Sequence, residues 1–181
     1  MNSHTFKKMK LKKNLFTTIL LLLLAMIAYT IYPVNALPKN TSIDSLIVYK
    51  SKRQLIVYEK GKIIKTYKIA LGKNPVGDKK IEGDKKTPEG RYIINSKNPK
   101  STFHKNLGIS YPNSFDRAEA KQLGHSPGGD VKIHGLKNGL GFIGKWHRSR
   151  DWTNGCIALT NSEIDELYNH VLIKTPIIIY P

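Results

Sequence analysis

The chain has 181 residues, a length that accommodates one globular domain with a short N-terminal attachment. Its single cysteine, Cys156, excludes an intramolecular disulfide. The formal net charge is +17, and removing residues 1–36, which carry five lysines and no acid, still leaves +12. Such a charge favours an anionic neighbour, and by itself it does not decide among nucleic acid, an acidic membrane surface and an acidic wall polymer.

The first 36 residues have the pattern of an export signal. Five lysines precede Leu15, and an uncharged apolar run of eighteen residues follows, LFTTILLLLLAMIAYTIY. A small-x-small site, Val34-Asn35-Ala36, ends the stretch, as in a secretory signal peptide. Because eighteen residues are at the lower limit for a membrane-spanning helix, an uncleaved N-terminal membrane anchor is the alternative. We therefore expect an exported protein of the periplasm or cell envelope, inner-membrane anchored in the second case, and no nucleic-acid partner.

Residues 37–181 are expected to form one β-rich domain, mainly strands with two short helices. Over residues 42–69, short β-branched and aromatic runs alternate with polar residues, which predicts a three-strand meander. Polar residues at 50–52 and 59–61 mark the turns between its strands. A glycine- and proline-rich segment, residues 72–90, then predicts a long ordered loop.

The second half of the chain predicts further strands and both helices. Strand character returns at residues 91–95 and 131–134, and again in the closing run at 175–180. Residues 114–124 contain helix formers and end on a glycine, where a C-terminal cap is expected. The clearest helix covers residues 160–171, because an S/T-x-x-E capping box starts it and one apolar stripe follows.

The strongest local signal for chemistry is the run DWTNGCIAL at residues 151–159. Cys156 follows a glycine-containing turn, so its thiol is presented where backbone N–H groups are free to stabilise an oxyanion. A thiol of ordinary pKa is mostly protonated at neutral pH and needs a base. His134, 22 residues upstream at the end of an expected strand, is the candidate base. The competing interpretation makes Cys156 a small buried hydrophobe and His134 a hydrogen-bonded core histidine.

Other histidines offer weaker candidates. His104, His125 and His147 lie in polar loops, within reach of a ligand, whereas His170 suits a helix C-terminus. No zinc site is expected, because the chain has neither an HExxH motif nor paired Cys and His ligand spacing. Nothing in the sequence indicates a cofactor or an oligomeric state.

Several separated motifs resemble the L,D-transpeptidase catalytic domain family (YkuD-type, the ErfK/YbiS/YcfS/YnhG group). They are GDKKTPEG at residues 83–90, ISYPN at 109–113, IHG at 133–135, the cysteine run at 151–159 and TNSEI at 160–164. The resemblance extends from about Ser42 to Pro181 and implies a β-sandwich-like catalytic domain.

The resemblance also implies a reaction. Cys156 attacks the carbonyl of the third residue, a diamino acid, in a peptidoglycan tetrapeptide stem and expels the terminal D-alanine. His134 takes the thiol proton, and the backbone carbonyl of Gly135 holds the imidazole. An amine of another stem resolves the thioester in a 3→3 cross-link. Water as acceptor would make the protein an L,D-carboxypeptidase or an amidase that releases wall-linked protein, and a non-catalytic cationic wall-binding module is a third hypothesis.

Substrate-binding roles follow around the nucleophile. The amides of Asn154, Gly155 and the cysteine itself are the expected oxyanion donors, and Thr153 belongs to the same turn. Arg150 either guides the stem's carboxylates or is a solvated charge, and Trp152 either lines the stem groove or packs. Many family members carry a second histidine where this chain has Asn154, so the acceptor stays open.

Overall fold

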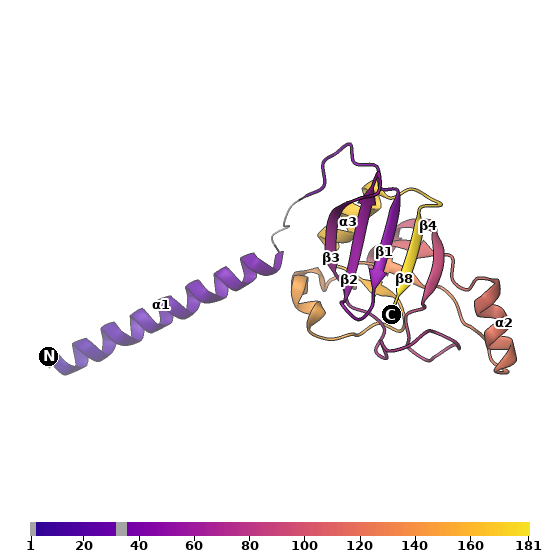
Figure 1. The fold of residues 1–181 in the computed structure, drawn as a ribbon. Helices are drawn as coiled ribbons and strands as arrows, with labels where there is room; N and C mark the ends of the chain where they lie inside the picture. Colours follow the sequence, from indigo (N-terminus) through magenta and orange to yellow (C-terminus); the bar gives the residue numbers. More distant parts are fainter. Residues whose placement is uncertain (1–2, 32–35) are drawn as a thin grey trace. The chain divides into compact units, whose positions relative to one another are not determined.

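The computed structural model of the protein describes residues 3–31 and 36–181, and the chain divides into two compact units, Met1–Tyr32 and Pro33–Pro181. The first unit holds helix α1 (Ser3–Ile31; Figure 1). Its segment Met9–Tyr29 is long and apolar enough to cross a membrane, and a signal sequence has the same properties. Val34 and Asn35 of the expected cleavage site lie outside the described residues.

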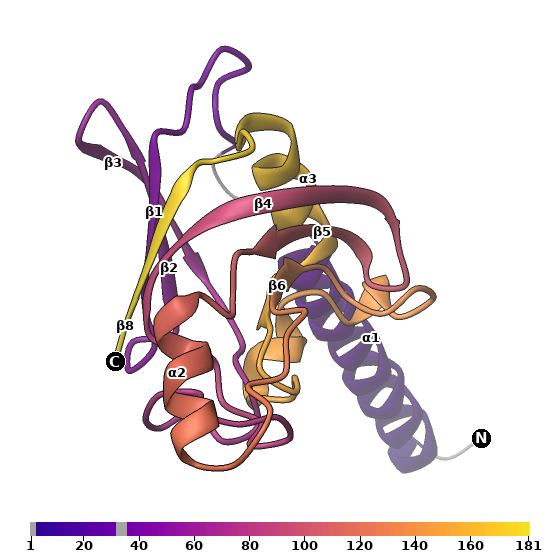
Figure 2. The same ribbon diagram turned by 90° about the vertical axis from the view of Figure 1, so that its right-hand side faces the viewer.

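The second unit is built on one eight-stranded sheet that curls along its longest strand (Figures 1 and 2). The strands are β1 (Ser45–Tyr49), β2 (Gln54–Glu59), β3 (Lys62–Lys68), β4 (Gly90–Ser101), β5 (His104–Ile109), β6 (Lys132–His134), β7 (Ile157–Ala158) and β8 (Pro176–Tyr180). Their order in the sheet is β3-β2-β1-β8-β4-β5-β6-β7. Strand β4 pairs with β8 through its first residues and with β5 through the rest. It therefore joins the two halves of the sheet, one made of β3, β2, β1 and β8 and the other of β5, β6 and β7.

The helices are α2 (Ser114–Gln122), the 3₁₀ segment η1 (Gly141–Ser149) and α3 (Asn161–His170). The predicted capping box starts α3: Thr160 Oγ1 accepts from the Glu163 N–H, and the Glu163 carboxylate accepts from the Thr160 N–H. Helix α3 packs against β5 and β6 and buries Ile164 and Leu167 completely. This helix therefore covers the half of the sheet that carries the site described below.

The predicted meander is confirmed as β1, β2 and β3, which pair antiparallel in sequence order. Alternation also holds in detail, since every second residue of β1 and of β8 is buried. The predicted final strand is inserted between β1 and β4 and runs parallel to β1. The mainly-β fold class is confirmed.

The sequence prediction was incomplete after residue 95, and it did not indicate that one lysine is buried. Strand β4 continues to Ser101, and β5 was not predicted, because the run SKNPKS is polar and contains a proline. Lys50 lies in the turn that the sequence predicts after β1, and it is 2% exposed. Its ammonium donates to the carbonyls of Gly77 (2.6 Å) and Thr87 (2.8 Å) and pairs with Glu89 Oε1 (2.8 Å). Lys50 thus fastens the long loop of residues 72–90 to the sheet.

Candidate active site

The turn that presents the nucleophile is closed by one side chain. Thr153 is buried; its Oγ1 donates to the Cys156 carbonyl (2.7 Å) and accepts from the Gly155 N–H (3.1 Å). Gly155 has φ +129°, and a Cβ there would lie 2.7 Å from the Lys86 carbonyl oxygen. Only glycine fits this conformation and this approach of the loop. Cys156 therefore stands at a fixed position directly before β7.

The same turn is anchored to the chain segment that follows β3. Asp151 pairs with Arg53 (Oδ2 to Nη2, 2.8 Å), and its other oxygen accepts from the Leu71 N–H (2.8 Å). The Thr153 N–H donates to the Leu71 carbonyl (3.1 Å), and the Lys73 N–H donates to the Thr153 carbonyl (2.9 Å). Because Asp151 and Thr153 are both hydrogen-bonded to other segments, the backbone of the turn is fixed, and so is the position of the Cys156 thiol.

Parallel pairing of β6 and β7 brings the two predicted catalytic side chains to one place. His134 is paired in register with Ala158, two residues beyond Cys156. The imidazole is 5% exposed, and its Nδ1 donates to the Gly135 carbonyl (2.7 Å). This hydrogen bond places the proton of a neutral ring on Nδ1, so Nε2 is the proton acceptor.

A groove of about 320 Å³ contains both residues. Cys156, His134, Trp152, Thr153 and Asn154 line it. Sequence reasoning missed the polar residues that complete its lining, which include Lys73, Asn106, Asp130 and Lys132. Asp130 and Lys132 precede His134 by four and two positions, a proximity that the sequence does display, whereas Lys73 comes from the long loop and Asn106 from β5.

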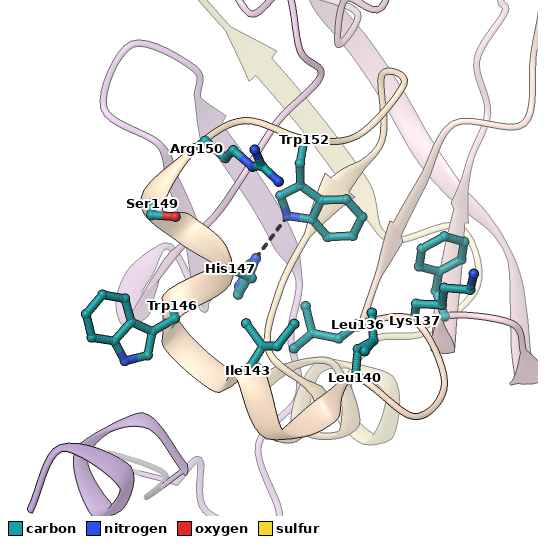
Figure 3. A pocket seen from close by; sticks show the side chains of 10 residues that line it. Leu136, Lys137, Leu140, Ile143, Trp146, His147, Ser149, Arg150 and Trp152 are labelled. Atoms are coloured by element: carbon teal, nitrogen blue, oxygen red, sulfur yellow. Dashed lines mark hydrogen bonds between the residues drawn. The ribbon is translucent and has the colours of Figure 1, made fainter. Parts of the chain in front are cut away.

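Arg150 is not part of that groove. It lines a neighbouring cavity of about 410 Å³, shown in Figure 3, whose walls include Leu136, Ile143 and Trp146. Trp152 and Phe103 line both cavities. The structure therefore assembles most of the predicted site residues around Cys156 and leaves Arg150 beside them.

The thiol and the imidazole are both held in their neutral forms. Burial raises the pKa of the Cys156 thiol above its ordinary value, although the amide of Lys132 favours the thiolate. Burial also lowers the pKa of His134, and the nearby Lys132 charge acts in the same direction. The Sγ atom lies 3.8 Å from the Asp130 carbonyl, its hydrogen-bond acceptor. The resting state is thus a thiol beside a neutral base, not a thiolate–imidazolium pair.

A second histidine lies behind the groove. Trp152 Nε1 donates to Nδ1 of His147 (3.3 Å; Figure 3), a buried residue of η1. Burial lowers the pKa of His147 to about 3, with the Arg148 charge as a further cause, so the ring is neutral. No local motif in the sequence indicates this pairing. Of the other histidines, His104 pairs with Asp165 (2.9 Å), and neither it nor His125 lines the groove.

Among the residues that the structure describes, no group of three or more histidine, cysteine, aspartate or glutamate side chains is placed to hold a metal ion.

Comparison with known proteins identifies relatives along most of the second unit. The sequence model of the L,D-transpeptidase catalytic domain, YkuD, matches residues 44–179. YafK of Escherichia coli (strain K12) is 31% identical over 130 residues, which is 68% of this chain and 45% of that protein.

Two solved structures are also similar to this chain. The helical cell shape determining protein Pgp2 of Campylobacter jejuni matches with a TM-score of 0.56 and 30% identity, over 77% of this chain and 48% of that one. Bd1075 of Bdellovibrio bacteriovorus matches with a TM-score of 0.54 and 26% identity, over 80% and 50% of the two chains. The chain spans about half the length of these relatives.

Proposed function

The chain belongs to the L,D-transpeptidase catalytic domain family, and we propose that it is an exported cysteine acyltransferase that acts on the tetrapeptide stems of peptidoglycan. One observation carries the proposal: Cys156 and a neutral His134, with its Nε2 unprotonated, line one groove beside a backbone turn that has unused amides. A non-catalytic wall-binding module would need none of these three features together.

The first step is proton transfer coupled to attack. The thiol proton of Cys156 moves to His134 Nε2 while Sγ bonds to the carbonyl carbon of the third stem residue. The Gly135 carbonyl, 2.7 Å from Nδ1, stabilises the imidazolium that forms. Because both groups start neutral, charge separates only when substrate has arrived and excluded water.

The negative charge that develops on the substrate oxygen needs donors from the backbone. The Gly155 N–H is already occupied by Thr153 Oγ1. Among residues 36–181, the amides of Asn154 and Cys156 donate to no acceptor, and we assign the oxyanion to these two. Losing one such donor typically costs about 10²–10³ in kcat.

Collapse of the tetrahedral intermediate breaks the C–N bond to the terminal D-alanine. The imidazolium returns its proton to the leaving amine, and the acyl group stays on Sγ as a thioester. An amine of a second stem then attacks the thioester in a 3→3 cross-link, with His134 accepting the amine proton and the thiol re-forming.

Charge in the groove supports an anionic stem as the donor. Lys73 is exposed at the rim, and Lys132 pairs with the exposed carboxylate of Asp130 (2.6 Å). We assign the stem's free carboxylates to these two lysines, because Arg150 lies in the neighbouring cavity.

The same charge favours water as a second candidate acceptor. A side-chain amine with an ordinary pKa of about 10.4 is protonated at neutral pH, and two lysines against one aspartate oppose its approach. With water as the acceptor, the protein is an L,D-carboxypeptidase that leaves a tripeptide, or an amidase that releases wall-linked protein.

Location follows from the N-terminal unit. We propose that α1 acts as a signal peptide or an anchor, with its lysines on the cytoplasmic side and the catalytic domain in the periplasm or cell envelope.

The test is a mass-spectrometric product analysis of purified disaccharide-tetrapeptide incubated with the protein and with Cys156→Ala. A dimer formed with loss of D-alanine, absent in the variant, establishes transpeptidation. Tripeptide without dimer establishes the carboxypeptidase. Absence of both products with the active-site thiol intact refutes action on the stem's terminal residue.

A further inference from the structure

The candidate base has one polar contact and two aromatic neighbours. His134 Nδ1 is held by the Gly135 carbonyl, which leaves the ring free to tilt about that bond. Phe103 lies against one side, with ring centroids 4.7 Å apart and planes inclined by 49°. Trp152 meets the imidazole with centroids 5.7 Å apart and planes inclined by 69°, and it also stacks with Phe103 at 6.1 Å. These two rings therefore set the direction in which Nε2 points.

The indole of Trp152 is fixed by a hydrogen bond to His147. An indole N–H is a donor only, and here it donates to Nδ1 of His147 at 3.3 Å, the dashed contact in Figure 3. His147 belongs to η1, where Gly144 breaks the helical path with φ 50° and ψ −133°. His147 lines the neighbouring cavity and not the groove that holds Cys156. Its contact with the site thus passes through the indole.

The protonation state of His147 suits an acceptor. Its ring is 7% exposed, and with a pKa of about 3 it stays neutral over the pH range of growth. Since Nδ1 accepts, the ring proton is on Nε2, and that atom is buried without a hydrogen-bond partner among the described residues. A buried N–H left unsatisfied costs about 1–3 kcal/mol. An apolar side chain would remove this cost but would leave the Trp152 N–H without its acceptor, so the imidazole at this position serves the indole.

We propose that His147 is a positioning residue for the acyl transfer: by accepting the Trp152 N–H it fixes the indole, and the indole fixes the imidazole of His134 against Cys156. The inference rests on the proposed function for its kinetic readout. His147 does not touch the reacting atoms, so its loss displaces the base without removing it.

The experiment uses the full chain in detergent micelles and compares His147→Leu with His147→Asn. Leucine removes the acceptor and fills the space, whereas asparagine places an amide oxygen near the position of Nδ1. We expect His147→Leu to lower kcat for D-alanine release by about 10-fold or more, with KM changed little, as a misplaced catalytic group does. His147→Asn should recover most of that loss. His170→Leu, the same change at the end of α3, serves as the matched control.

A readout independent of substrate is the rate of Cys156 alkylation as a function of pH, with unfolding midpoints measured in parallel. The charged groups around Cys156 and His134 are Asp130, Lys132, Lys73 and Lys79 on the groove side, and those around His147 are Arg148, Arg150 and Lys137 on the cavity side. All of them are kept in both variants. We expect His147→Leu to slow alkylation near neutral pH while the unfolding midpoint stays close to that of the parent.

The outcomes separate the two claims. If the parent protein releases no D-alanine but the alkylation profiles differ as expected, the proposed function fails and the positioning role of His147 stands. Identical alkylation profiles for the parent and His147→Leu overturn the inference. Equal losses in the leucine and asparagine variants, accompanied by a lowered unfolding midpoint, also overturn it, because they show a packing role.

Discussion

Lys50 offers a quantitative test of how the long loop supports the nucleophile. Replacing it with methionine keeps most of its volume and removes the ammonium that joins Gly77, Thr87 and Glu89. The loop in turn touches the catalytic turn, since the Lys86 carbonyl packs against Gly155. Lys50→Met should therefore weaken both the stability of the domain and the order of the loop.

The loss of stability can be worked out from the groups that Lys50→Met leaves without a partner. Breaking a buried ion pair costs about 3–5 kcal/mol. Glu89 is 20% exposed and regains some hydration, whereas the Thr87 carbonyl stays buried. We therefore expect a loss near the lower limit, about 3 kcal/mol in the free energy of unfolding. With a urea m-value of about 1.5 kcal/mol/M, the unfolding midpoint falls by about 2 M.

The assay is urea unfolding followed by circular dichroism, combined with limited trypsin digestion. Exposed Lys80 and Lys85 report opening of the loop, because cleavage after them requires local unfolding. Lys52→Met, which removes an exposed lysine from the same turn, should shift the midpoint by about 0.3 M or less. If Lys50→Met behaves like Lys52→Met in both measurements, the reasoning about the loop is refuted.

Other predictions concern the groove and the buried histidines. Thr153→Val should cost about 1–3 kcal/mol in urea unfolding and most of the activity, because the valine cannot close the turn, while Thr153→Ser should retain both. Since burial lowers the pKa of His134, the base stays neutral in mild acid, and the acid limb of D-alanine release should have its midpoint below about pH 6.5; a midpoint above that value contradicts the assignment. Lys73→Gln should raise KM for the stem more than Arg150→Gln does, and the reverse order would move the carboxylate site to the neighbouring cavity. His147 binds a proton near pH 6.5 when unfolded and only near pH 3 when folded, so the parent should lose about 4–5 kcal/mol of stability as pH falls from 6.5 to 3, and His147→Leu should remove that part of the slope.

The sequence predicted those strands and helices that are indicated by a pattern within a single short segment. The period of two in β1 and β2 and the capping box of α3 are properties of short segments, and both are present. Strand β5 and the second half of β4 were missed, because they are polar and their pairing with each other is not encoded in either segment alone.

The candidate site divides in the same way. Motif context predicted Cys156, His134 and the turn between Thr153 and Gly155, and the structure places them in one groove. The burial of Lys50 and of His147 was not predictable, since each depends on partners at least five residues away that only the folded chain brings near. In both cases a polar residue in a polar segment is buried by tertiary contacts alone.

The place of β8 in the sheet has a consequence for how the chain is made. Strand β8 follows every other strand in the sequence, yet it lies in the middle of the sheet, between β1 and β4. Because β8 follows the other seven strands in the sequence, it emerges after them, and the sheet lacks its central strand until β8 has appeared. On the export route proposed above, this topology delays completion of the sheet until β8 has crossed the membrane.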